Sequence, residues 1–304
     1  MDELLIGVRA VHFAATAMVV GIFVFTVAVA NPSLRSQADA GRALRRRLAM
    51  LAGLSLAVAV LSGAVWLLLI AAEIGNEALA ESLRSEVAWT VLTQTRFGYV
   101  SIARLAIASV LFVFLAAGRW DWVAASAAAA FGGALAWCGH AGASPGLAGD
   151  FNVCADAVHL VAAGAWFGGL GPLALLLAAA REANNPAWAQ IAAGATARFS
   201  TVGLVSVATL FATGIINVLM LVGNVATLME GDYGRLLMLK IVIFLLMVAV
   251  ACVNRLYLMP RMAEVGRVRQ LQRNCLIEIG LGVAVLLIVA ALGTISPMGH
   301  AHAH

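Results

Sequence analysis

Long apolar runs separated by short polar stretches dominate the pattern along this chain of 304 residues. About 20 predominantly apolar residues are enough to cross a bilayer as a helix. On this basis we predict eight transmembrane helices, at residues 4–30, 48–72, 97–117, 121–139, 153–180, 199–222, 235–258 and 274–295. The pattern therefore indicates an all-α integral membrane protein, whose function lies in the helix bundle and its short loops.

Composition agrees with this fold class, because 63% of the residues are hydrophobic and only 11% are charged. Soluble domains carry roughly a quarter charged residues. The lipid bilayer is thus the expected surrounding. The net charge of +4 indicates topology rather than nucleic-acid binding, and we expect no nucleic-acid partner.

The first apolar run could be mistaken for a signal peptide, since Ala28-Val29-Ala30 is similar to a cleavage site. The run is too long for the apolar region of a signal peptide, it follows the acidic Asp2 and Glu3, and it contains Arg9 and His12. We therefore expect a retained first helix.

Arginines are distributed unequally between the two sets of loops. Thirteen arginines lie in or beside the loops after the first, third, fifth and seventh predicted helices, and three lie on the opposite side. Cytoplasmic loops of membrane proteins carry the excess of Lys and Arg. We therefore predict that both termini are extracytoplasmic.

The two halves of the chain are similar to each other in register, as is common in transporters. Three pairs of predicted helices carry matching residues at equal spacing: His12 and Gly21 with His159 and Gly168, Arg47 and Gly63 with Arg198 and Gly214, and Gly98 and Arg104 with Gly234 and Lys240. We predict two four-helix repeats, residues 1–139 and 140–304. Because four is an even number, the repeats should be related by a pseudo-two-fold axis along the membrane normal.

Ionisable residues within the predicted helices indicate a polar pocket. Asp156 and His159 lie one helical turn apart, and such groups in a membrane usually face the bundle interior and mark a functional path. From the helical rise, His12, Arg104, His159 and Lys240 each lie roughly 10–12 Å from the outer end of their helices. We predict an outward-facing pocket between the two halves. The cations in or near it, Arg9, Arg104 and Lys240, should pair with Asp156 or with polar backbone.

Imidazole and thiol groups near this depth suit copper or zinc. The candidate ligands are His159, His140, His12, Cys138 and Cys154. Asp156 could orient one imidazole as a hydrogen-bond partner, and Asn217 lies deeper. The tail residues Met298, His300, His302 and His304 could collect metal or could be without consequence. Cys138 and Cys154 could instead form a disulfide, and an intramembrane histidine such as His12 can serve packing alone.

At these residues the chain resembles the copper-resistance D family of bacterial inner-membrane proteins, which have eight helices. The resemblance rests on Gly139-His140-Ala141, Asp156 with His159, Trp166-Phe167-Gly168-Gly169-Leu170, Thr213-Gly214 with Asn217, Tyr233-Gly234-Arg235 with Lys240, and Leu292-Gly293 with Pro297. It implies copper handling at the inner membrane, with passage from periplasm to cytoplasm as the favoured direction. It also implies a separate periplasmic copper-binding protein as partner.

Three hypotheses follow. The first is a non-enzymatic copper transport or resistance protein, without an ATP-binding G-x-x-x-x-G-K-[ST] loop. The second is a b-type cytochrome in which His12 and His159 ligate one haem. The third is a copper sensor or scaffold that docks a partner, for which the acidic segment 73–86 is a candidate surface.

Overall fold

The computed structural model describes residues 2–34, 38–82, 86–139, 146–183, 185–221, 231–262, 264 and 266–295, and within these residues all regular structure is helical. All eight predicted apolar runs coincide with helices. The elements are α1 (Asp2–Phe25), η1 (Thr26–Ala30), α2 (Asn31–Leu34), α3 (Ala38–Gly75), α4 (Leu79–Ser82), α5 (Glu86–Gln94), α6 (Arg96–Ala116), α7 (Trp122–Gly133), η2 (Ala134–Cys138), α8 (Leu147–Ala163), η4 (Gly164–Gly168), α9 (Gly169–Ala183), α10 (Pro186–Leu221), α12 (Asp232–Val253), η5 (Asn254–Leu258), η6 (Met259–Arg261) and α13 (Arg267–Leu292).

Several of these elements join into longer helices. In the part of the chain that the structure describes, seven helices are long and apolar enough to cross a membrane: Asp2–Leu34, Gly41–Gly75, Arg96–Ala116, Leu147–Ala183, Pro186–Met220, Asp232–Arg261 and Arg267–Leu292. The eighth predicted run forms a shorter apolar helix, Trp122–Cys138, whose last turn is a 3-10 helix. The protein is therefore an all-helical membrane protein, with about seven candidate spans among its described residues.

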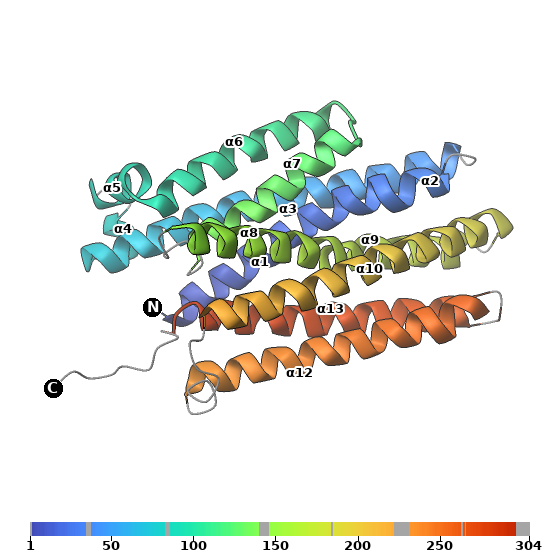
Figure 1. The fold of residues 1–304 in the computed structure, drawn as a ribbon. Helices are drawn as coiled ribbons and strands as arrows, with labels where there is room; N and C mark the ends of the chain where they lie inside the picture. Colours follow the sequence, from blue (N-terminus) through green and yellow to red (C-terminus); the bar gives the residue numbers. More distant parts are fainter. Residues whose placement is uncertain are drawn as a thin grey trace.

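Helix α1 lies at the centre of the bundle (Figure 1) and contacts α3, α7, η4, α9 and α13. In the most apolar 18-residue stretch of the span Asp2–Leu34, 67% of the residues are buried, against 11% in the corresponding stretch of Asp232–Arg261. Large apolar side chains such as Leu239, Val242 and Leu246 are exposed on α12. Exposed apolar rows on long helices are what a lipid-facing surface requires, so hydropathy alone could not separate central from peripheral helices.

The central crossing joins the first predicted helix to the fifth at two glycines. A Cβ atom on Gly21 would overlap with the backbone of Gly168 and Gly169, and one on Gly168 would overlap with the carbonyl oxygen of Ala17. Small residues let helix backbones approach this closely. The crossing occurs where the helix of α8 becomes π-helical, in η4.

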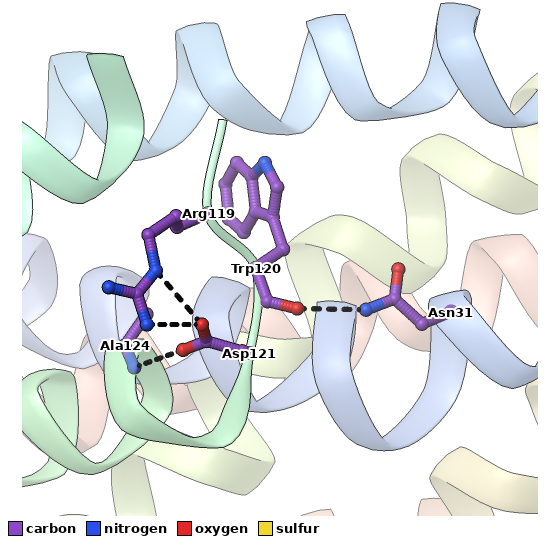
Figure 2. A network of polar contacts seen from close by, with 5 residues as sticks. All are labelled: Asn31, Arg119, Trp120, Asp121 and Ala124. Carbon is purple, nitrogen blue, oxygen red and sulfur yellow. Dashed lines mark hydrogen bonds and ion pairs between the residues drawn. The ribbon is translucent and has the colours of Figure 1, made fainter. Parts of the chain in front are cut away.

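Polar contacts fasten the turn between α6 and α7 (Figure 2). The Asp121 carboxylate accepts hydrogen bonds from the Ala124 backbone N–H at 3.0 Å and from the Arg119 guanidinium. These bonds hold the pKa of the Asp121 carboxyl below its usual value. The Asn31 side-chain amide donates to the carbonyl oxygen of Trp120 at 3.0 Å. The turn is thereby tied to α2.

The helices of the bundle run alternately in opposite directions (Figure 1). The C-terminal ends of α2, α6, α9 and α12 gather at one end of the bundle, and the N-terminus lies at the other end. The loops in which the sequence concentrates arginine therefore share one end, which we call the arginine-rich end; the opposite end is the N-terminal end.

Candidate functional site

A cavity of about 340 Å³ lies in the N-terminal half of the chain. Its lining includes His12 from α1, Trp66 from α3, Arg104 from α6 and Cys138 from η2. Three of the residues that the sequence singled out thus share one cavity. The rest of its lining is mostly apolar, including Phe97.

The hydrogen bonds of His12 identify its tautomer. Nδ1 of His12 lies 3.1 Å from the Ser62 hydroxyl, and that hydroxyl donates its hydrogen to the carbonyl oxygen of Val58 at 2.6 Å. Because a hydroxyl has a single hydrogen, Ser62 must accept from His12, so Nδ1 carries a proton. Nε2 of His12 then has a free lone pair, which accepts from the Arg104 guanidinium at 3.0 Å.

Arg104 is a buried cation held by α1 and α7. Its guanidinium also donates to the Thr16 hydroxyl at 3.0 Å and to the carbonyl oxygen of Phe131, and it lies 4.1 Å from the Phe131 ring centre. The side chain is 5% exposed. The expected pairing with polar backbone is therefore present, and it leaves Nε2 of His12 occupied.

A second polar cluster lies in the C-terminal half, between α8, α10 and α12. Nδ1 of His159 lies 2.9 Å from the Thr213 hydroxyl, which donates to the carbonyl oxygen of Thr209 at 2.7 Å. By the same reasoning Thr213 accepts from His159, so Nδ1 is protonated. Nε2 of His159 has no hydrogen-bond partner among the described residues. Its lone pair is free for a ligand.

The sequence predicted that Asp156 could orient one imidazole, and the described hydrogen bonds of Asp156 do not include one to His159. The Asp156 carboxylate accepts from the side-chain amide of Asn217 at 3.1 Å and interacts electrostatically with Lys240 of α12. Asp156 and His159 share a helix face, but each reaches a different residue of α10. The orienting partner of His159 is Thr213.

The predicted single pocket between the halves differs from the arrangement of the described residues. His12 and Arg104 form one cluster, and His159, Asp156 and Lys240 form another. The crossing at Gly21 and Gly168 brings the backbone of α1 against that of η4, so the two halves are in direct contact there.

Arg9 joins neither cluster. Its guanidinium lies 5.2 Å from the Trp66 ring centre and 5.8 Å from that of Phe13, and it occupies the space where a Cβ of Gly293 would stand. It therefore connects α1 and α3 to the end of α13. Among the described residues, the contacts of Arg9 are with aromatic rings, where a cation is favoured, rather than with Asp156.

Two models of known protein families match this chain. Residues 1–150 match the family described as copper resistance protein D-like, N-terminal domain, and residues 193–292 match copper resistance protein D. The chain belongs to the copper resistance protein D family.

Two curated relatives match in sequence. Copper resistance protein D of Pseudomonas syringae pv. tomato is 34% identical over 171 residues, and inner membrane protein YebZ of Escherichia coli K12 is 33% identical over 165 residues. Each match covers 54% of this chain and 55% of the relative. The chain thus spans about half the length of the curated relatives it matches. No solved structure matches it.

The cysteines of this family member are free where described. Cys138 is half-buried at its cavity, whereas Cys154 is exposed on α8, so the structure contains no disulfide between them. No group of three or more His, Cys, Asp or Glu residues stands close enough to hold a metal within the described ranges. The candidates His140, Met298, His300, His302 and His304 lie outside the described residues.

Sequence reasoning missed the hydroxyl partners Ser62, Thr213 and Thr16. The signal was present, because Ser62-Gly63 and Thr213-Gly214 stand at matching positions of the two halves. It indicated a repeat but not a histidine partner, since only the packing of α3 on α1 and of α10 on α8 joins the groups.

Proposed function

We propose that this copper resistance D family member carries copper across the bacterial inner membrane and that His159 is its principal ligand in the bundle. The observation that carries the proposal is the free Nε2 lone pair of His159, held in place by Thr213. Neutral imidazole is a preferred copper ligand, and a histidine ligand is commonly fixed through its other ring nitrogen. The family and the inner-membrane name of one relative support the setting.

Charge at the second cluster suits transient binding. Asp156 supplies a negative group close to His159, and Lys240 offsets it when no metal is bound. A single histidine with few further donors binds copper weakly enough for release, as passage requires. We propose entry from the periplasm towards the cytoplasm, with both termini periplasmic and the N-terminal end as the entrance.

In this proposal, the other candidate ligands deliver copper to His159. Cys138, Cys154, His140 and the tail residues Met298, His300, His302 and His304 would receive copper from a soluble periplasmic copper-binding protein and pass it towards His159. His12 has a different role in this proposal: with its Nε2 bound to Arg104, it stabilises the N-terminal cavity.

We further propose that residues 1–139 and 140–304 are two four-helix repeats, with Trp122–Cys138 as the eighth crossing. The two clusters support this view, because each contains a histidine whose Nδ1 meets a hydroxyl next to a glycine, and a cation from the third helix of its half. The crossing glycines Gly21 and Gly168 also hold matching positions. Nε2 of His159 is free, whereas Nε2 of His12 accepts a hydrogen bond from Arg104. In this proposal, only the C-terminal half therefore retains the ligand function.

The test is copper binding and uptake by purified protein in proteoliposomes, with residues 296–304 removed from every variant. We expect His159→Ala to lose both bound copper and uptake, and His12→Ala to retain copper binding. His12→Ala is the matched control, since it removes an intramembrane imidazole at the corresponding position.

Unchanged uptake by His159→Ala at equal incorporation would contradict the proposal. A visible spectrum of the same samples tests the cytochrome alternative. Iron with a Soret band, lost in both histidine variants, would assign the protein to that class instead.

A further inference from the structure

A second cavity, of about 100 Å³, lies away from both histidine clusters and contains a buried carboxyl group. Glu278 of α13 lines it and is 1% exposed. The residue stands about 16 Å along α13 from its start at the arginine-rich end. Nothing in the copper proposal uses this group.

The carboxyl group of Glu278 stands at the end of a chain of side-chain amides. The side-chain amide of Asn274 donates to the side-chain oxygen Oδ1 of Asn254 at 2.7 Å, and the side-chain amide of Asn254 donates to Oε1 of Glu278 at 2.7 Å. Asn254 opens the π-helical segment η5, and such segments are frequent at functional sites. One oxygen of Glu278 is thus held in a fixed direction.

The other oxygen, Oε2, has no hydrogen-bond partner among the described residues, and neither does Oγ1 of Thr196 on the same cavity. Buried polar atoms are nearly always satisfied by protein or by water. A water needs roughly 10–15 Å³ measured in this way. The cavity therefore has room for several waters to satisfy both atoms.

No described cation pairs with Glu278. The other titratable groups on the cavity are Cys252 of α12, Cys275 of α13 and Arg255 of η5. Arg255 donates to the Ser200 hydroxyl at 2.6 Å rather than to Glu278. The residues that α9, η4 and α10 contribute carry no titratable group. A permanently ionised carboxylate without a counter-ion is costly in a membrane.

We propose that Glu278 is a proton-binding residue, which takes up and releases a proton through water held in this cavity. A proton fits the donor set better than a metal, because no cluster of three or more metal ligands occurs within the described ranges. Resting on the proposed function, the proton site couples copper movement to the proton gradient.

Helix packing provides a physical link between the two sites. Trp166 lines the Glu278 cavity, and Phe167 occupies the space where a Cβ of Gly282, one turn beyond Glu278, would stand. Both aromatic residues belong to η4, which continues directly from the helix that bears His159. A shift of that helix on copper binding would therefore move a wall of the Glu278 cavity.

The test of proton binding does not need copper. Infrared difference spectra of detergent-purified protein between acidic and alkaline buffer should contain the carbonyl band of a protonated carboxylic acid. Glu278→Gln keeps the shape and the acceptor for Asn254, so it should fold and lose this band. Glu182→Gln, which changes an exposed glutamate at the end of α9, should keep it. In wild type, carbon-13 labelling of glutamate should shift the band, which assigns it to a glutamate rather than to an aspartate such as Asp156.

Retention of the band in Glu278→Gln would overturn the proposal, as would its absence from wild type. Loss of the band on addition of sodium at constant pH would overturn it in favour of a metal cation. His159→Ala should leave the band unchanged, so failure of the copper proposal is distinguishable from failure of the proton-binding proposal.

Coupling is tested in proteoliposomes, where a pH gradient should stimulate copper uptake by wild type but not by Glu278→Gln. Equal stimulation of both would overturn the coupling.

Discussion

At the scale of single residues, the two intramembrane histidines differ in what their Nε2 atoms meet. Both donate through Nδ1 to a hydroxyl that is itself committed to a backbone carbonyl. Nε2 of His12 accepts from Arg104, while Nε2 of His159 is unpartnered among the described residues. The chemistry available to an imidazole thus depends on its neighbours, which its own position in the sequence does not reveal.

Replacement of Thr213 tests this view of His159. Thr213→Val keeps the shape of the side chain but removes the acceptor for Nδ1, so the imidazole loses its fixed tautomer and orientation. We expect copper affinity to fall about 10- to 100-fold, as for other partners of ligating histidines, whereas Thr213→Ser should stay near wild type. Competition titration with a copper chelator measures the affinity, and equal affinity of the Val and Ser variants would contradict the role given to Thr213.

At the scale of elements, the crossing of α1 and η4 depends on glycine in both helices. Gly168 meets the carbonyl oxygen of Ala17, and Gly21 meets the backbone of Gly168 and Gly169. Backbone atoms cannot rotate away as a side chain can. The central position of α1 therefore follows from the absence of two side chains at matching positions of two helices.

Alanine substitutions separate this packing effect from helix propensity. Gly168→Ala and Gly21→Ala should destabilise the protein by at least about 1–3 kcal/mol, the usual cost of an overfilled core. Gly53→Ala in α3 is the matched control, because a Cβ there would meet nothing within 4 Å; the better helix propensity of alanine should leave it unchanged or up to about 1 kcal/mol more stable. Thermal unfolding in detergent measures all three, and equal midpoints would show that the crossing tolerates a Cβ.

At the scale of the whole molecule, the helices run alternately between an arginine-rich end and the N-terminal end (Figure 1). The excess of arginine predicts that the first of these ends faces the cytoplasm. The proposed entry of copper and the proposed proton site both depend on this orientation.

Single cysteines test the orientation in a background in which the four native cysteines are replaced. Ala78→Cys lies at the N-terminal end and Ala117→Cys at the arginine-rich end, and both positions are exposed. A membrane-impermeant maleimide should label Ala78→Cys in intact spheroplasts and Ala117→Cys only after permeabilisation. The reverse pattern would invert the proposed entrance.

The sequence by itself determined the class of protein, the position of the helices and the residues worth attention. Apolar runs must form helices in lipid, because every backbone polar group there needs an internal partner, and all eight runs did so. Ionisable residues within those runs are rare, and they are costly in a membrane, so the sequence by itself marks His12, His159, Asp156, Arg104 and Lys240 as candidates for function.

Only the tertiary structure decided which of these groups meet. Asp156 and His159 are one turn apart in sequence, yet their partners are Asn217 and Thr213, more than fifty residues away. Hydropathy does not reveal how one helix is rotated about its axis relative to its neighbours. That rotation brings the Arg104 guanidinium into hydrogen-bond contact with Nε2 of His12 and leaves Nε2 of His159 without a partner among the described residues. The same rotation joined Asn254 and Asn274 to Glu278, so the physical reason for the division is that helices form locally, whereas sites form where helices pack.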